Sequence, residues 1–410
     1  DSYAEIGPRA YTPYRGHMFE GFIQDSWKAT SKLRVELGLR YTLMQPYYYS
    51  LWGNMAVFDT NRYDPAKAVV MDPRTGNVLS GDRYNGIIIP GTGWPDAAIG
   101  RVAIASDPSF NRLFSGGSKT FGQWQKKNFA PRIGLAYAFN SKNVLRAGVG
   151  TFYQRPGVAD NIFLGGQAPF QPFVSVATGS VDNPGGTQGV GFPFYYMTQD
   201  PVYKIPRSHQ WNVTFERELP FDTILTTGYI GRVGTHLERV RNLNQLQPGT
   251  IQANPGVNVN ALRPYKGFAQ IDANENAARS EYNSFQLEAN RRFSKGLLLG
   301  FAYTLSKSMD NGSQRRNILY NAFDDRNFWG ASEFDTRHIV MFNYVYELPL
   351  FRDSQGIKKT MLGGWQVSGN TQWQTGTPFT VQTGDDFAGT GTGGQPWQLT
   401  SDISYPRQFA

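Results

Sequence analysis

The stretch Leu33-Arg-Val-Glu-Leu-Gly-Leu-Arg-Tyr-Thr-Leu43 decides the fold class, because apolar and polar residues alternate through it. Every odd position carries Leu, Val or Tyr, and the even positions carry Arg34, Glu36, Gly38, Arg40 and Thr42. A repeat of two residues is typical of a β-strand with one apolar and one polar face. The segment therefore predicts a strand that lies between an apolar and an aqueous environment.

Similar segments recur along the chain and predict ten strands in total. They lie near residues 17–27, 33–44, 128–139, 144–153, 208–219, 223–233, 281–293, 297–306, 338–348 and 365–374. A tilted strand needs roughly 9 to 11 residues to cross a membrane, whereas strands of soluble proteins average about 5 to 6. The length of these segments favours membrane-spanning strands.

The connections between these strands alternate between short and long. The short turns are 28–32, 140–143, 220–222, 294–296 and the longer 349–364, and the long links are 45–127, 154–207, 234–280 and 307–337. Outer-membrane barrels have short periplasmic turns and long extracellular loops. The alternation predicts an antiparallel transmembrane β-barrel and indicates which end of each strand is extracellular.

The distribution of polar residues supports the same fold. Polar residues on the predicted outward faces lie near strand ends, where contact with lipid costs least: His209, Arg217, Asn283 and Arg291. The inward faces carry Glu20, Arg34, Glu36, Arg40, Arg132, Arg146, Glu216, Glu218, Arg232, Glu288, Arg292 and Glu347. A wide aqueous lumen accommodates such a set, whereas the packed core of a soluble propeller or sandwich does not.

Aromatic residues mark the expected membrane interfaces. The upper girdle is predicted at Tyr41, Tyr153, Tyr229 and Tyr303, and the lower girdle at Trp27, Phe139 and Phe293. Tyr and Trp favour the interface because their rings are apolar and their tips polar.

Composition excludes several other classes of protein. The chain has 410 residues, no cysteine, and a net charge of +8 that is scattered among acidic residues, so it predicts no disulfide and no nucleic-acid partner. The longest apolar run, Leu297–Leu305, is far shorter than the roughly 20 residues of a spanning helix.

Short motifs, in their order along the chain, resemble the barrels of Oar-like TonB-dependent outer-membrane receptors. They are Gln24–Lys28 (QDSWK), Leu37–Tyr41 (LGLRY), Phe129–Gly134 (FAPRIG), Gln210–Asn212 (QWN), Gly228–Gly231 (GYIG), Tyr282–Gln286 (YNSFQ), Arg291–Gly296 (RRFSKG), Tyr303–Ser308 (YTLSKS), Phe334–His338 (FDTRH), Gly364–Gln366 (GWQ) and Gln374–Phe379 (QTGTPF). The resemblance covers most strands between about residues 17 and 382 and leaves the long loops unmatched.

This resemblance implies a 22-stranded barrel with an N-terminal plug domain in its lumen. Residues 1–410 are then part of a single barrel domain, with the plug, an N-terminal domain and the terminal strands outside this chain. The tail 395–410 is predicted to be an unfinished extracellular loop. The implied location is the outer membrane of a Gram-negative bacterium, in contact with outer-membrane lipid and lipopolysaccharide.

The resemblance further implies uptake energised by a TonB-type complex, which contacts a segment absent here, and an unknown extracellular solute: a carbohydrate, a peptide or a metal chelate. The alternative function is a structural or adhesive surface protein whose long loops contact neighbouring molecules. An outer-membrane hydrolase is a more distant alternative, because no motif pairs a nucleophile with a histidine base.

The sequence predicts no catalytic residue, no metal site and no cofactor. The four histidines, His17, His209, His236 and His338, share no metal-ligand spacing and lie near strand ends, where hydrogen bonding explains them. The Asp310–Ser313 stretch (DNGS) lacks the alternate oxygen ligands of a calcium loop and fits a turn.

Ligand contacts are predicted instead in the first long loop, which is rich in aromatic residues. These are Tyr47, Tyr48, Tyr49, Trp52, Trp94 and Trp124. Rigid aromatic surfaces suit the recognition of sugars or peptides. The alternative, which we favour, is that these side chains pack the loop onto itself or lie at the membrane interface.

Overall fold

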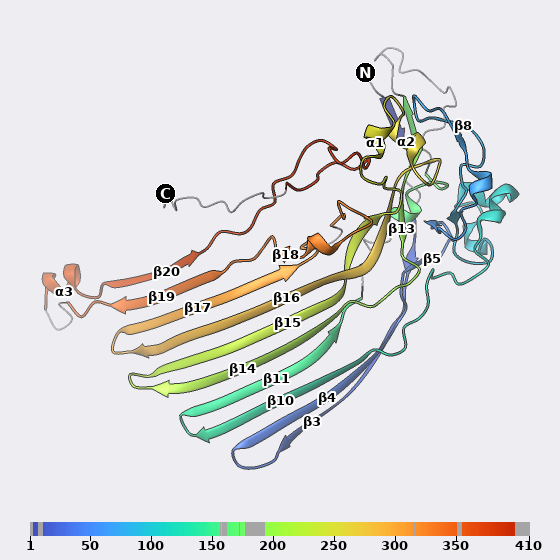
Figure 1. Ribbon diagram of the computed structural model, residues 1–410. Helices are drawn as coiled ribbons and strands as arrows, with labels where there is room; N and C mark the ends of the chain where they lie inside the picture. Colours follow the sequence, from blue (N-terminus) through green and yellow to red (C-terminus); the bar gives the residue numbers. More distant parts are fainter. Residues whose placement is uncertain are drawn as a thin grey trace.

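The computed structural model describes residues 3–6, 11–155, 157, 162–171, 173–176, 193–314, 317–350 and 355–397. Its main feature is one long, curved antiparallel sheet, with short turns at one end of the strands and long loops gathered at the other (Figure 1).

All ten predicted strands are present, and each pairs with its sequence neighbours within the sheet. They are β3 (Met18–Lys28), β4 (Leu33–Met44), β10 (Phe129–Asn140), β11 (Asn143–Tyr153), β14 (Arg207–Leu219), β15 (Thr223–Asn242), β16 (Phe268–Ser294), β17 (Leu297–Asp310), β19 (His338–Glu347) and β20 (Gln366–Gln374). This meander is the simplest order for hairpin-connected strands, since antiparallel neighbours need only a short turn.

The register of the strands aligns their apolar residues into one continuous band. Leu37 lies opposite Ile133, and Ile133 lies opposite Val149, so three strands present apolar side chains side by side. These side chains remain 49%, 50% and 51% exposed. A band of exposed apolar side chains this wide is the surface that lipid covers in a membrane barrel.

The opposite face of the sheet is polar. The register places all twelve charged residues predicted to point inward on this face, as alternation requires. Two cross-strand ion pairs lie among them, Arg40–Glu20 and Arg146–Glu216, both at 3.2 Å. In an outer-membrane barrel the polar face lines the lumen.

The short turns lie together at one end of the sheet, as predicted (Figure 1). Between β16 and β17, Lys295 and Gly296 adopt left-handed φ angles of 50° and 75°. Two residues with positive φ form the hairpin turn whose twist matches the flanking strands. The longest connection at this end, between β19 and β20, contains helix α3 (Ile357–Leu362).

The prediction of a loop over 234–280 is wrong at both ends, because β15 and β16 continue past the ranges predicted to span a membrane. A register shift follows Gly234, after which pairing resumes at Leu237–Ala278 and extends to Asn242–Asp272. Strand β13 (Phe194–Gln199) joins this extension in parallel with β16. The extension, called the ribbon below, has polar residues on both faces, so it carries no alternation of the kind that lipid imposes.

The long loops fold into an ordered layer built on the ribbon. Two buried apolar clusters hold it together, one around Met44, Tyr47 and Met55, the other around Phe58, Tyr196 and Phe268. Residues of the first loop, the second loop and the ribbon contribute to these clusters, so three segments distant in sequence share common cores.

Short elements complete the loop layer. The strands are β1 (Tyr3–Ile6), β2 (Tyr14–Arg15), β5 (Tyr49–Ser50), β6 (Val57–Phe58), β7 (Val70–Met71), β8 (Val78–Ser80), β9 (Ile87–Ile88), β12 (Phe173–Val176) and β18 (Gly330–Ala331). The helices are α1 (Thr250–Ala253), α2 (Val259–Leu262) and the 3₁₀ turns η1 (Pro65–Lys67), η2 (Asp96–Ala98), η3 (Ala103–Ser106), η4 (Pro108–Leu113), η6 (Ile162–Gly165) and η7 (Arg326–Phe328). Among the described residues, no helix is both long and apolar enough to cross a membrane.

The sheet is open in this structure. Within the part of the chain that the structure describes, β3 and β20 form the two edges, and each pairs with one neighbour only. The predicted tail lies outside the described residues from position 398 onward.

Candidate functional site

A cavity of about 410 Å³ lies at the loop end of the polar face, and we call it the vestibule cavity. Its walls come from the end of β17, the loop 311–337 with β18, the start of the loop after β15, and residues 380–396.

Asp310 anchors the wall of the vestibule cavity at the end of β17. It continues the lumen-facing row of that strand, opposite Ser280, and is 5% exposed. Its carboxylate accepts hydrogen bonds from the Ser313 hydroxyl at 2.9 and 3.0 Å and from the Gly312 N–H at 3.1 Å. The predicted turn at 310–313 is therefore confirmed, and the carboxylate stabilises it.

Two stacked rings form the apolar part of the cavity. Tyr320 and Phe328 lie with their ring centroids 5.3 Å apart and their planes 17° apart. The Gln382 side chain donates a hydrogen bond to the Tyr320 hydroxyl. Burial raises the pKa of the Tyr320 phenol, and the Glu333 carboxylate adds to this, so the phenol stays protonated.

The charged side chains that line the vestibule cavity are all acidic: Asp310, Asp324 and Glu333. Asp324 pairs with Arg326 at 2.6 Å, and hydrogen bonds from Arg326 lower the pKa of its carboxyl to about 2. No lysine or arginine is among the described lining residues. The cavity thus offers carboxylate and amide acceptors beside a pair of aromatic rings.

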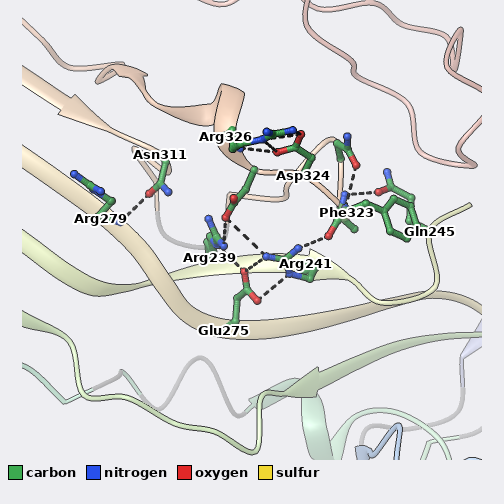
Figure 2. Close-up of polar contacts among 12 residues, drawn as sticks. Arg239, Arg241, Gln245, Glu275, Arg279, Asn311, Phe323, Asp324 and Arg326 are labelled. Carbon is green, nitrogen blue, oxygen red and sulfur yellow. Dashed lines mark hydrogen bonds and ion pairs between the residues drawn. The ribbon is translucent and has the colours of Figure 1, made fainter. Parts of the chain in front are cut away.

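A buried charge cluster fastens the loop 311–337 to the ribbon. Figure 2 shows Arg239 and Arg241 between Glu275 and the loop that carries Asp324 and Arg326. Glu275 accepts from Arg239 at 2.6 Å and from Arg241 at 3.0 Å, and Arg239 also pairs with Asp325 at 2.6 Å. Arg239 and Glu275 are 3% and 13% exposed, so their contact is shielded from solvent, whereas Asp325 is 40% exposed. Together these charge-assisted contacts hold one wall of the vestibule in place.

The chain after β20 forms the other side of the cavity. Residues 381–397 fold back on themselves, with backbone hydrogen bonds from Thr383 to Gln395 and from Trp397 to Val381. The buried Arg263 donates to the Asn244 carbonyl at 2.6 Å and to the Gly391 carbonyl at 2.9 Å, which ties this hairpin to the loop after β15. Burial lowers the pKa of Arg263 to about 10, while nearby carboxylates act in the opposite direction.

The six loop aromatics predicted from the sequence are dispersed through the loop layer. Tyr47 is 2% exposed within the first apolar cluster. The Arg155 guanidinium lies 4.1 Å from the Tyr48 ring centroid, and Tyr49 lies in β5 within 3.4 Å of the His17 ring. Ligand contact by these residues stays a prediction, and the contacts above join them to other parts of the loops.

The three tryptophans of this set are also separated from one another. Trp52 packs on Tyr11 at 5.2 Å, Trp94 packs edge-on against Phe114 at 5.0 Å, and Trp124 lines a different cavity on the outer side of the sheet. None of the six aromatics is among the residues that line the vestibule cavity.

The predicted girdle residues lie on the apolar face. Tyr229 donates to Asn283 at 2.5 Å, and Tyr303 is hydrogen bonded to His338 at 2.9 Å, so two polar outward residues have aromatic partners. The remaining girdle positions are Tyr41 beside Phe129, Tyr153 opposite Arg207, and the exposed Trp27, Phe139 and Phe293.

Histidine hydrogen bonding agrees with the interpretation made from the sequence. His209 contacts the Thr151 hydroxyl at 3.0 Å, and His338 contacts Tyr303. Within the described ranges, no group of three or more His, Asp or Glu side chains is arranged to hold a metal ion.

Most vestibule residues were missed by sequence reasoning. Only the Asp310–Ser313 turn was singled out, whereas Tyr320, Phe328 and Glu333 lie in a loop without periodicity. In the sequence, Tyr320 and Phe328 lie among several Asn and Asp residues. This combination is too common in loops to identify a binding site.

Sequence comparison decides the family. The family described as "Outer membrane beta barrel domain" matches residues 1–408, which is nearly the whole chain. The chain belongs to this family. It is accordingly a multi-pass β-barrel protein of the outer membrane, and its apolar face is the lipid-facing face.

Several solved outer-membrane proteins are similar to this family member. The pyoverdine receptor FpvA from Pseudomonas aeruginosa is 11% identical, with a TM-score of 0.39, and the match covers 90% of this chain and 32% of that chain. The alcaligin receptor FauA from Bordetella pertussis is 12% identical over 88% of this chain and 38% of that one, with a TM-score of 0.37.

The copper transporter OprC is 10% identical over 81% of this chain and 33% of that one, with a TM-score of 0.39. The chain thus spans about a third of the length of these solved proteins. No curated protein matches the sequence.

Proposed function

We propose that this chain forms part of the wall and the extracellular vestibule of a TonB-dependent receptor of the Oar-like type. In this proposal the receptor takes up a bulky or scarce solute, and a plug elsewhere in the protein releases it when a TonB-type complex acts. The observation that carries the proposal is the vestibule cavity, which opens at the loop end of a continuous polar face.

Barrel closure is part of the same proposal. The edges β3 and β20 would leave backbone groups unpaired in lipid, and an unsatisfied group there costs several kcal/mol. Further strands that bring the total to about 22, enough for a plugged lumen, would pair both edges. Residues 1–410 are then one section of a single barrel domain.

The chemistry of the vestibule cavity narrows the solute. Carboxylate and amide acceptors bind hydroxyl or ammonium groups, and the Tyr320–Phe328 pair offers a flat surface for a sugar ring or a peptide side chain. A strongly anionic metal chelate would face the carboxylates of Asp310 and Glu333, while Asp324 is neutralised by its ion pair with Arg326. Of the three solute classes expected, carbohydrate and peptide therefore fit better than an anionic chelate.

Binding and uptake by the full-length protein test this proposal. Oligosaccharides, peptides and ferric chelates are presented to the detergent-purified protein in calorimetry, and to cells with and without a proton gradient. The Tyr320→Leu substitution should weaken binding of the preferred solute about 10- to 30-fold, as loss of a buried aromatic contact does.

The matched control is Tyr346→Leu, which removes a tyrosine from the lipid-facing side near the short turns. This variant should bind as the unmodified protein does. Solute accumulation that persists after the proton gradient is collapsed would refute energised uptake. Equal effects of both substitutions would refute the assignment of the vestibule.

A surface-contact role is the second candidate, and exposed apolar side chains on the loop layer favour it. Val70 in β7 is 56% exposed, and Leu79 in the paired strand β8 is 63% exposed. Adjacent exposed apolar side chains mark surfaces that contact other molecules. If adhesion is the function, Val70→Ser with Leu79→Ser should abolish cell aggregation while solute binding is unchanged.

A further inference from the structure

A second cavity, of about 760 Å³, lies on the outer side of the sheet beneath the loop layer, and we call it the rim cavity. Its lining includes Lys126, Lys127 and Arg207, together with Trp124, Tyr153 and Tyr203. The proposed uptake pathway on the polar face uses none of these residues.

The register of β11 and β14 fixes the position of the rim cavity. The outward-facing residues of the two strands lie opposite one another in pairs. From the short-turn end toward the loops, these pairs are Leu145–Phe215, Ala147–Val213, Val149–Trp211, Thr151–His209 and Tyr153–Arg207. The apolar face therefore turns polar at the level of the cavity. In a membrane this is the height at which acyl chains give way to headgroups, on the extracellular side.

The charge of the rim cavity is positive. Lys126 and Lys127 are exposed, and Arg207 is half-buried with its Nε donating to the Thr235 hydroxyl at 3.0 Å. Across the described residues, no carboxylate lines the cavity, and no ion pair involves these three side chains. Three cations without a protein counter-ion favour an anionic ligand.

Aromatic side chains complete the rim cavity. Tyr153 packs against the first apolar cluster, and Tyr203 is a buried member of that cluster, 3% exposed. Trp124 lies in the segment that leads into β10, two residues before Lys126. Tyr and Trp rings favour the level of the headgroups, so the half-buried Tyr153 and Trp124 support a ligand at the sugar and phosphate layer of the membrane.

We propose that the rim cavity binds the phosphorylated sugar headgroup of an outer-leaflet glycolipid of the lipopolysaccharide type. The phosphates lie against Lys126, Lys127 and Arg207, and the acyl chains run down the apolar wall below Tyr153. This site depends on the membrane position of the sheet and is independent of the solute that the vestibule takes up.

The test uses the full-length protein in nanodiscs and measures binding of bisphosphorylated lipid A, dephosphorylated lipid A and inorganic phosphate. Each basic side chain near an anionic lipid surface strengthens binding about fivefold, so three contribute on the order of 100-fold. Combined Lys126→Gln, Lys127→Gln and Arg207→Gln substitutions should weaken binding of bisphosphorylated lipid A by that factor. Dephosphorylated lipid A should bind the unmodified protein as weakly as bisphosphorylated lipid A binds this triple variant.

The matched control replaces three cations at the opposite end of the sheet, with Lys28→Gln, Lys142→Gln and Arg217→Gln. Arg217 is also on the outward face, opposite Asn143, and the control removes an equal charge from the short-turn end of the sheet. The control should keep the affinity for bisphosphorylated lipid A. Equal loss in both variants would overturn the proposal, because general charge would then explain binding.

Two further measurements distinguish binding of a lipid headgroup from binding of a free anion, and loss of binding from loss of folding. Inorganic phosphate that binds as tightly as bisphosphorylated lipid A would overturn the assignment to a lipid headgroup. The Lys126→Glu and Lys127→Glu pair changes two exposed side chains only, so the barrel should fold and keep its heat-resistant gel mobility. If this folded variant binds the lipid normally, the proposal is wrong.

Discussion

The buried charge cluster makes a quantitative prediction for the ribbon, tested by Glu275→Gln. The substitution keeps the shape of the side chain but removes the negative charge that two arginines share. Arg239 and Glu275 are 3% and 13% exposed, so water cannot replace the lost contact. Removing one partner of a buried ion pair costs about 3 to 5 kcal/mol. Because glutamine still offers one carbonyl oxygen, we expect the lower end, about 3 kcal/mol.

Hydrogen exchange of the ribbon amides is the assay. A loss of about 3 kcal/mol corresponds to roughly 150-fold faster exchange through local opening, read over residues 237–242 and 272–278. The amides in the membrane-spanning parts of β15 and β16 should keep their protection from exchange. Pairing with neighbouring strands in the membrane stabilises these parts independently of the ribbon.

The same substitution in an exposed pair provides the control. Glu216 pairs with Arg146 on the polar face, where the two side chains are 35% and 53% exposed. Exposed pairs contribute about 0 to 1 kcal/mol, so Glu216→Gln should speed local exchange by no more than about fivefold. If Glu275→Gln changes ribbon exchange as little as the control does, the cluster does not fasten the loop to the ribbon.

Three further predictions concern the wall and the ribbon. Leu37→Arg places a charge in the middle of the apolar band and should destabilise the barrel by about 2 to 4 kcal/mol in lipid unfolding titrations, whereas Gly38→Arg, which points into the lumen, should be tolerated. Gly231→Ala should cost about 1 kcal/mol in the same titration, since the added Cβ would overlap the Trp211 ring. Burial raises the pKa of Asp272, so the folded ribbon holds the proton of this carboxyl more tightly than the unfolded chain does. The ribbon should therefore lose stability as pH rises from about 4 through that raised pKa. Hydrogen exchange of the ribbon amides against pH measures this loss, and Asp272→Asn should remove the pH dependence.

The membrane-spanning strands could be predicted from the sequence because lipid on one side and water on the other impose strict alternation. The β4 stretch that begins at Leu33 shows this, and its predicted and observed ranges are both 33–44. The ribbon could not be predicted, because it meets protein or water on both faces. Residues 268–280 pair with β15 and β13, yet no repeat of two residues runs through them.

The candidate site was harder to predict for a related reason. Tyr320 and Phe328 meet Asp310 only because β18 pairs with the end of β17 and brings the loop 311–337 back over the strand. That return depends on the contacts of Arg239 and Arg241 with Glu275 and Asp325, which join segments up to 86 residues apart. Sequence patterns report local environment, and these contacts are not local.

The two cavities have lining side chains of opposite charge. The vestibule cavity is lined by three carboxylates without a described lysine or arginine, and the rim cavity by three cations without a described carboxylate. At physiological ionic strength charges are screened beyond about 8 Å, so each cavity acts on its own side of the wall. The net charge of +8 therefore predicts neither ligand. In the two proposals above, the face of the strand from which the side chains project determines the ligand: phosphorylated headgroups on the outward face, and the solute on the polar face.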